Sequence, residues 1–220
     1  PQYTDAFEIS HTYKSSTILS VNYSHTRNTM IQNVLQDTAT KSTHQTTSNI
    51  NGSNSFGFTF STPLVIAKWW TITPNLNINY NRYLASGSSI GGLLNAGKVA
   101  FNLNAMSTMI LPNDFTVEFM GNYNSSAIYG YLHADPQYSI SGGLQKNLFK
   151  KKASLKFNVN DIFYTEKFSG RQPNINLIVL NRWESRRASL TFTYRFGSNG
   201  SNNHKDTGSA EEKNRVKSSH

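Results

Sequence analysis

Residues 186–197, RRASLTFTYRFG, decide the fold class of this chain. Large apolar side chains occupy every second position at Leu190, Phe192, Tyr194 and Phe196, and the residues between them are small and polar or charged. A period of two places alternate side chains on opposite faces of a β-strand. The stretch therefore predicts a strand with one aromatic face and one hydrophilic face.

The same alternation recurs along most of the chain, and no convincing amphipathic helix interrupts it. It predicts about nine strands of roughly ten residues, the length that a tilted transmembrane strand needs. A further apolar run, INLIVL at residues 175–180, is a candidate for a tenth. The stripes lie at residues 7–13, 19–23, 56–60, 70–80, 99–105, 115–123, 138–144, 155–159 and 190–196. The sequence thus predicts an all-β antiparallel meander of about 9–10 transmembrane strands.

Short and long connections alternate along the chain. Tight polar turns are expected at residues 14–16, 63–68, 111–114 and 150–152, and long loops at about 28–54, 84–95, 129–133 and 164–185. Outer-membrane barrels have this organisation, with short periplasmic turns and long external loops. If the last strand ends in the periplasm, an odd count makes the first strand run in the same direction. Closed bacterial single-chain barrels have even counts, so strands upstream of this segment are expected.

The composition also favours an outer-membrane protein. Hydrophobic residues make up 37% and charged residues only 15%, and there is no cysteine. No run approaches the roughly 18 apolar residues of a transmembrane helix. The net charge of +9 is spread along the chain, apart from Lys150, Lys151 and Lys152. Nucleic-acid binders concentrate their charge on one patch, so outer-membrane lipid and lipopolysaccharide are the expected partners and nucleic acid is not.

Two sets of residues follow from the alternation. Rows of asparagine would make a poor protein core but a good lining for a water-filled lumen. The opposite rows would face lipid, which satisfies apolar side chains without a second sheet. The expected lumen-lining residues are Asn75, Asn77, Asn79, Asn102, Asn104, Glu118, Asn122, Lys156, Asn158 and Asn160. The expected lipid-facing residues are Leu155, Phe157, Val159, Leu190, Phe192, Tyr194 and Phe196.

Aromatic residues near strand ends predict an interfacial girdle, because amphipathic rings collect at headgroup level. The alternative is an ordinary position in a core or at a sheet edge. The residues concerned are Trp69, Trp70, Tyr80, Tyr83, Tyr123 and Tyr138.

A third set could contact a ligand if loops close over the barrel mouth, since aromatic rings with arginine suit stacking on sugars or amphiphiles. Packing between loops, or contact with lipopolysaccharide, is the alternative. The set is Tyr129, Tyr131, His133, Arg171 and Trp183.

Motifs for catalysis, metal binding or cofactor binding are missing from the sequence. No histidines are spaced as metal ligands, so His44 and His133 are interpreted as loop residues. A rim enzyme could use His133 with Asp5, Asp37 or Asp135, but nothing in the sequence positions them. GSSIGG at residues 87–92 lacks the lysine and helix of a phosphate loop. We therefore expect no enzyme and no cofactor.

Four stretches in order resemble TonB-dependent outer-membrane receptors over roughly residues 1–197. PQYTDAFEIS at the start resembles an external loop entering a strand. Residues 54–80, NSFGFTFSTPL followed by KWWTITPNLNINY, resemble a strand, turn and strand unit. Residues 155–168, LKFNVNDIFYTEKF, resemble the penultimate strand, and RRASLTFTYRFG resembles the closing strand. The abundance of Asn, Thr and Tyr is closest to the receptor-like barrels of Bacteroidetes-type bacteria.

The resemblance implies a location in the bacterial outer membrane and a 22-stranded barrel, of which residues 1–197 form the C-terminal part. It also implies an N-terminal plug domain, an inner-membrane energising complex as partners, and an unidentified bulky nutrient as ligand. Residues 198–220 are expected to be a polar disordered tail. Two alternatives stay open. One is a self-contained small barrel acting as a pore, adhesin or rim enzyme, and the other is a soluble all-β carbohydrate-binding module.

Overall fold

The computed structural model describes residues 1–37, 39–40, 42–85, 97–173 and 177–196. Within these residues the long elements are all strands, and no helix is both long and apolar enough to span a membrane. The strands are β1 (Tyr3–Tyr13), β2 (Thr17–Arg27), β3 (Met30–Asp37), β4 (Ser42–Asn49), β5 (Gly52–Ser61), β6 (Leu64–Ala67), β7 (Trp70–Leu84), β8 (Gly97–Leu111), β9 (Phe115–Asn124), β10 (Ala127–Tyr129), β11 (Leu132–Ala134), β12 (Gln137–Leu148), β13 (Ala153–Asn160), β14 (Lys167–Gln172), β15 (Leu177–Arg182) and β16 (Arg187–Tyr194).

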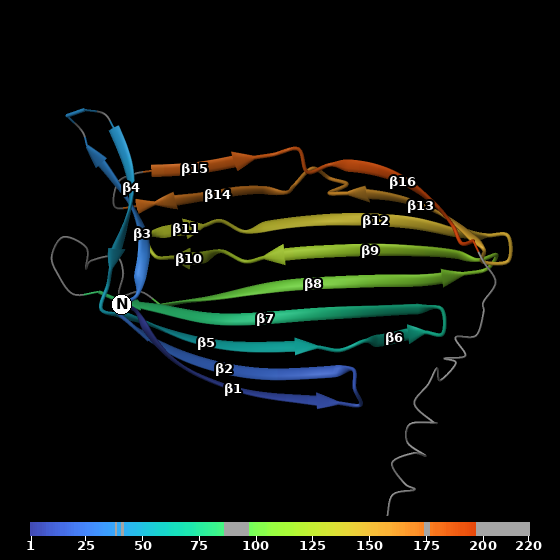
Figure 1. Ribbon diagram of the computed structural model, residues 1–220, viewed down its shortest axis with the longest axis horizontal. Coiled ribbons are helices and arrows are strands. Elements are labelled where there is room, and N and C mark those ends of the chain that lie inside the picture. Colours follow the sequence, from blue (N-terminus) through green and yellow to red (C-terminus); the bar gives the residue numbers. More distant parts are fainter. Residues whose placement is uncertain (38, 41, 86–96, 174–176, 197–220) are drawn as a thin grey trace, which may run out of the picture.

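One large antiparallel sheet dominates the structure (Figure 1). Its strand order is β1-β2-β5-β7-β8-β9-β12-β13-β16, with β6 paired to β7 beside β5. Each strand of this path pairs with the next strand of the path, which confirms the predicted meander of about 9–10 strands. β1 and β16 form the two edges and do not pair with each other, so the described sheet is open.

Two hairpins prolong the large sheet at one end. β10–β11 continues β9 and β12, and β14–β15 continues β13 and β16 (Figure 1). The hairpins join through β11 and β14, where His133 pairs with Arg171. The loops predicted at residues 129–133 and 164–185 are therefore largely strands. The described part of the apolar run, residues 177–180, lies in β15 and is not a tenth spanning strand.

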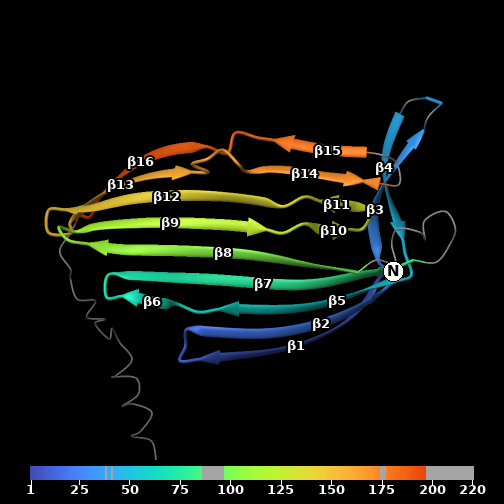
Figure 2. The same ribbon diagram turned by 180° about the vertical axis from the view of Figure 1, so that it is seen from behind.

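The predicted long polar loop at residues 28–54 is also wrong, because β3 and β4 form a hairpin there. Figures 1 and 2 show this hairpin lying across the ends of the large sheet, near the N-terminus and the ends of β14 and β15. A small buried cluster holds it in place, in which Ile31 and Ile50 pack with Ala85 and Tyr131. The segment lacks an apolar stripe, but two isolated isoleucines are sufficient to anchor the base of the hairpin, while most of its described residues stay exposed.

The two ends of the large sheet differ as predicted. Short turns connect the strands at one end, and the long connections gather with the N-terminus at the other (Figures 1 and 2). Several short turns place residues other than glycine in the left-handed region, as at Asn113 (φ 60°) and Asp114 (φ 61°). Asparagine and aspartate tolerate this conformation better than most residues, which explains the LPND turn. We refer to the end with the long connections as the outer end.

Two predicted segments lie outside the described residues. They are the GSSIGG loop at residues 87–92 and the polar tail at residues 198–220.

Candidate functional site

The register of the large sheet separates its side chains into two chemically distinct faces. Directly paired residues on neighbouring strands point to the same side. Leu155 pairs with Phe192, and Phe157 pairs with Leu190. The predicted lipid-facing residues of β13 and β16 therefore lie on one side of the sheet. The pairing of the remaining strands extends this side across the whole sheet, and we call it the apolar face. Phe196 lies beyond β16, with its ring 4.7 Å from the ring of Tyr194.

No second layer covers the apolar face within the described residues. Even on strands with a neighbour on both sides, Phe56 is 48% exposed, Phe157 46% and Phe119 44%. A soluble protein rarely leaves a continuous apolar surface of this extent in water. The exposure therefore excludes a sandwich core for these rings and favours contact with lipid.

The apolar face ends in an ordered boundary at the outer end. An aromatic row crosses four strands through Phe7, Tyr23, Phe56 and Tyr80. The next row outward is polar and consists of Asp5, His25, Asn54 and Arg82. His25 Nδ1 of this row lies 2.6 Å from Asn54 Oδ1, and Asp5 forms an ion pair at 3.0 Å with Arg27 of the following row. Such a change from rings to charges is typical of the boundary between acyl chains and headgroups.

The opposite side, which we call the polar face, carries every residue predicted to line a lumen. Its asparagines bond to one another across and along strands, as where Asn77 Nδ2 donates to Asn75 Oδ1 at 2.8 Å. Asn104 donates to Asn102, which donates to Asn124. Lys156 Nζ and Glu118 Oε2 form an ion pair at 2.8 Å on the same face. Whether this face meets a water-filled lumen stays a prediction.

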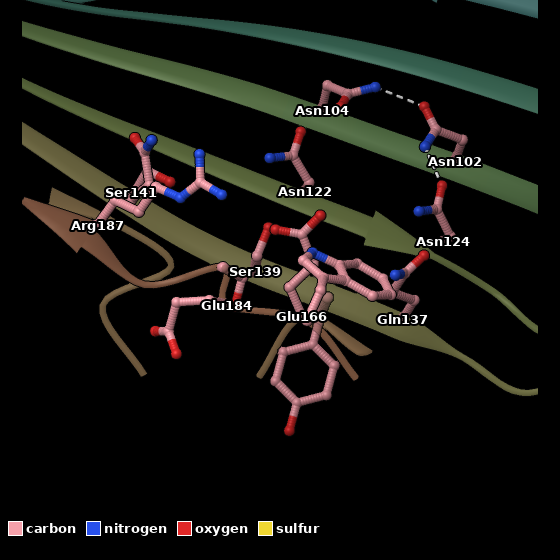
Figure 3. A pocket seen from close by; sticks show the side chains of 14 residues that line it. Asn102, Asn104, Asn122, Asn124, Gln137, Ser139, Ser141, Glu166, Glu184 and Arg187 are labelled. Atoms are coloured by element: carbon pink, nitrogen blue, oxygen red, sulfur yellow. Dashed lines mark hydrogen bonds between the residues drawn. The ribbon is translucent and has the colours of Figure 1, made fainter. Parts of the chain in front are cut away.

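A polar hollow of about 480 Å³ opens on this face towards the outer end (Figure 3). β8, β9 and β12 form its floor with amides and hydroxyls, and the β13–β14 and β15–β16 connections form its wall. The side chains of Asn122 and Glu166 make no hydrogen bond within the described part of the chain, so they are free to bind a ligand. Its lining residues are Asn102, Asn104, Asn122, Asn124, Gln137, Tyr138, Ser139, Ser141, Asn160, Glu166, Trp183, Glu184, Ser185 and Arg187.

Asp161 holds this wall together. It follows the last residue of β13 and is only 1% exposed. Its carboxylate accepts hydrogen bonds from the Ser185 hydroxyl at 2.6 Å, the Glu166 amide at 2.9 Å, and the Thr165 amide and hydroxyl at 2.9 and 3.1 Å. The two connections that build the wall thus meet at one carboxylate.

The environment of Asp161 keeps it ionised. Burial pushes the pKa of Asp161 upward, but the hydrogen bonds from Ser185, Glu166 and Thr165 outweigh burial and lower its pKa below the ordinary 3.8. Above that pH the carboxylate is therefore charged and accepts from all three residues.

Comparison with known families agrees with this geometry. The model of the outer membrane protein beta-barrel family matches residues 1–194. The chain belongs to the outer membrane protein beta-barrel family. No curated protein and no solved structure matches the chain. The family match covers nearly all described residues and confirms the predicted location in the bacterial outer membrane.

As a member of this barrel family, the chain spans the outer membrane with strands. Several of the aromatic residues predicted to form an interfacial girdle have positions that agree with this. Trp69 and Trp70 stack at 6.0 Å beside the turn before β7, and Trp70 Nε1 donates to Ser107 Oγ at 2.9 Å. Tyr123 and Tyr138 pair on the apolar face. Tyr83 does not belong to the girdle, because it lies on the polar face and packs against the cluster around Tyr131.

The predicted ligand-contact residues are dispersed in this barrel. Trp183 lines the polar hollow. His133 and Arg171 face each other on β11 and β14, and Tyr129 is exposed on the β10–β11 hairpin. Tyr131 is only 4% exposed and belongs to the buried cluster, so it does not face a ligand at the mouth.

Several residues of the hollow were missed by the sequence analysis. Glu166 and Glu184 come from connections whose path the alternation does not predict. For Glu166 the available signal was the NDIFYTEKF stretch, which also carries Asp161. Arg187 is the first residue of β16 and pairs with Asn160 on the polar face, so its side follows from the alternation of that strand.

The Tyr131 hydroxyl supplies a stability prediction for this barrel. It is buried and has no hydrogen-bond partner among the described residues, and burial raises the pKa of Tyr131. A buried hydroxyl without a partner carries its desolvation cost uncompensated. We expect Tyr131→Phe to leave the thermal midpoint unchanged or to stabilise the fold by up to about 1 kcal/mol. Tyr131→Ala should instead cost roughly 3 kcal/mol, because it opens a cavity. Thermal unfolding of both variants in detergent checks this.

Residues considered for metal binding or rim catalysis occupy other roles. No group of three His, Asp or Glu in the described part of the chain could hold a metal ion. Asp5 pairs with Arg27, Asp135 accepts from Ser169, and His44 contacts Ser42. Asp37 accepts from the backbone amide of Ala39 at the tip of its own hairpin.

Proposed function

We propose that this chain is the C-terminal part of a larger TonB-dependent receptor-like barrel that imports a bulky nutrient. The observation that carries the proposal is the open sheet. β1 and β16 are unpaired edges, and nine strands in alternating order make them run in the same direction. Unpaired edges are not tolerated in hydrocarbon, so a barrel must close them. Two edges of the same direction cannot close an antiparallel barrel, so an odd number of further strands is needed, as a 22-stranded barrel would supply.

In this proposal the chain contributes wall, lumen lining and external loops, and has no catalytic role. A plug domain would occupy the lumen, and an inner-membrane complex would supply the energy. The polar hollow supports a nutrient-binding role, because it lies at the outer end of the polar face, where cargo would arrive.

The chemistry of the hollow favours a neutral, hydroxyl-rich nutrient. Side-chain amides donate and accept at once, as sugar hydroxyls do. Glu166, Glu184 and Arg187 carry one net negative charge between them, which disfavours an anionic chelate. Trp183 offers an aromatic surface of the kind on which apolar sugar faces stack.

Uptake in the producing bacterium tests this proposal. A strain lacking the gene, and a strain lacking the inner-membrane energising protein, are grown on a panel of glycans and iron chelates. We expect both strains to lose growth on the same neutral glycan. Full-length protein should restore growth, and a Trp183→Ala, Asn122→Ala double variant should take up the radiolabelled glycan about tenfold more slowly.

The control is Ser20→Ala, which alters a hydroxyl of the polar face far from the hollow and should transport normally. Growth that does not depend on the energising protein would contradict the proposal. Stable ion conductance of the purified chain alone in a planar bilayer would instead support the self-contained pore.

A further inference from the structure

A second hollow of about 440 Å³ lies beside the polar one, on the other side of Trp183. Its aromatic lining consists of Tyr138, Tyr164 and Trp183. Tyr138 belongs to the apolar face, where it pairs with Tyr123. Tyr138 and Trp183 line both hollows, but Lys167 and Arg182 share their face of the β14–β15 hairpin with the exposed Leu180 and Ile178. The second hollow therefore opens towards the side that the apolar face presents, whereas the first opens on the polar face.

Two cations and one carboxylate line the second hollow. Lys167 and Arg182 both line it and are directly paired on β14 and β15. Neither makes an ion pair within the described part of the chain. Arg186 lies 5.1 Å from the ring centre of Tyr164. Glu166 is the lining carboxylate, and Asp135 accepts a hydrogen bond from the lining Ser169 hydroxyl at 2.9 Å, so three cations lie at or beside the hollow with two anions.

Like charges directly opposite each other destabilise a sheet pair. An anion bound between the two charges relieves this repulsion. Arginine binds phosphate oxygens with two parallel hydrogen bonds, and lysine adds a point charge. The pair of Lys167 and Arg182 is therefore suited to a phosphate group.

The position of the hollow indicates where the phosphate comes from. It lies at the outer end of the sheet, where β12 and the β14–β15 hairpin both line it, and its aromatic rings are of the kind that collect at headgroup level. A water-soluble phosphate ion has no apolar part that could contact the three aromatic rings. An amphiphile, by contrast, would place its phosphate at Lys167 and Arg182. Its sugar, or the first carbons of its acyl chains, would contact Tyr138 and Trp183.

We propose that this hollow binds the phosphorylated headgroup of an outer-leaflet lipid, namely a lipid A phosphate of lipopolysaccharide. Lys167 and Arg182 hold the phosphate, and Tyr138, Tyr164 and Trp183 contact the headgroup beside it. The inference goes beyond nutrient uptake and does not depend on it, because it concerns the outward side of the barrel wall.

The test uses full-length protein in detergent and lipid A purified from the producing bacterium. Thermal midpoints are measured against increasing phosphorylated lipid A, against enzymatically dephosphorylated lipid A and against inorganic phosphate. We expect saturable stabilisation by phosphorylated lipid A alone. The Lys167→Gln, Arg182→Gln double variant should need at least about tenfold more lipid for half the shift. Lys167→Arg, Arg182→Lys should bind like the wild type, since it keeps both charges.

The matched control is Arg171→Gln, Lys98→Gln, which removes the same charge at exposed or half-buried positions outside the hollow and should bind normally. Equal binding of phosphorylated and dephosphorylated lipid A would overturn the proposal. It would also be overturned if inorganic phosphate stabilised the protein equally, or if the control lost as much affinity as the double variant. Native mass spectrometry confirms that each variant remains folded and shows how much lipid A co-purifies.

Discussion

Replacing Asp161 with asparagine is expected to destabilise the folded barrel by about 2 to 4 kcal/mol. The substitution keeps the volume but removes the charge, and it turns an amide NH₂ group towards donors from Ser185 or Glu166. Hydrogen bonds to a charged group contribute roughly 1.5–3 kcal/mol each and are not additive. The loss should be large because a buried group has no access to water as a substitute partner.

Urea unfolding in lipid vesicles measures this loss. Asp135→Asn serves as the control, since Asp135 is exposed and accepts one hydrogen bond, from Ser169 at 2.9 Å. It should change stability by less than about 1 kcal/mol. If Asp161→Asn were no worse than this control, Asp161 would not hold the wall of the polar hollow. Ser185→Ala should show part of the same loss, because it removes one of the donors.

The second large effect is expected from a charge placed on the apolar face. Phe157→Arg should cost about 2 to 4 kcal/mol, the range for arginine near the bilayer midplane on the lipid side of a barrel. Phe157 lies mid-strand on β13, opposite Leu190, and is half exposed with no protein layer over it. In cells the variant should accumulate poorly in the outer membrane.

Asn158→Arg is the matched control, one residue along the same strand but on the polar face. The same charge there should cost less than about 1 kcal/mol, because the polar face offers water and the neighbouring Asn and Gln side chains. Both variants are compared by urea unfolding in vesicles and by the amount of heat-modifiable protein in outer-membrane fractions. Equal losses for the two would mean that the faces have been assigned to the wrong solvents.

The strands and their faces were predictable because a simple periodicity encodes them. The apolar side of β16 can be predicted from Leu190, Phe192 and Tyr194 alone, without the sequence of the neighbouring strands. The polar side of β7 can be predicted in the same way from the asparagines of residues 75–79. A one-residue slip of register would exchange the two faces, so alternation also constrained the pairing.

The outer-end hairpins were not predictable by the same route. β3 and β4 are rich in Thr, Ser and Gln, so their sequence resembles a solvated loop. Their position depends on Ile31 and Ile50, which pack with Ala85 and Tyr131 from distant parts of the chain. No pattern within a short stretch of the sequence predicts these contacts between distant residues.

The polar hollow was predictable in part. Its asparagine floor follows from strand alternation, and Asn102, Asn104, Asn122 and Asn160 were expected on this face. Its wall depends on a hydrogen bond between residues 24 apart, from Ser185 to Asp161. Periodicity does not predict which two connections meet, so Glu166 and Glu184 could only be found from the structure, whereas the side of Arg187 follows from the alternation of β16.

The cluster of Ile31, Ile50, Ala85 and Tyr131 has a consequence for how this chain responds to heat. It excludes water from its own interior, as the core of a soluble protein does, whereas the large sheet is stabilised by the acyl chains around it. Thickening or stiffening the bilayer should therefore strengthen the sheet and leave the cluster unaffected. Warming should disrupt the cluster with the heat-capacity increase of exposed hydrocarbon, so that the mouth of the barrel loosens while its wall persists.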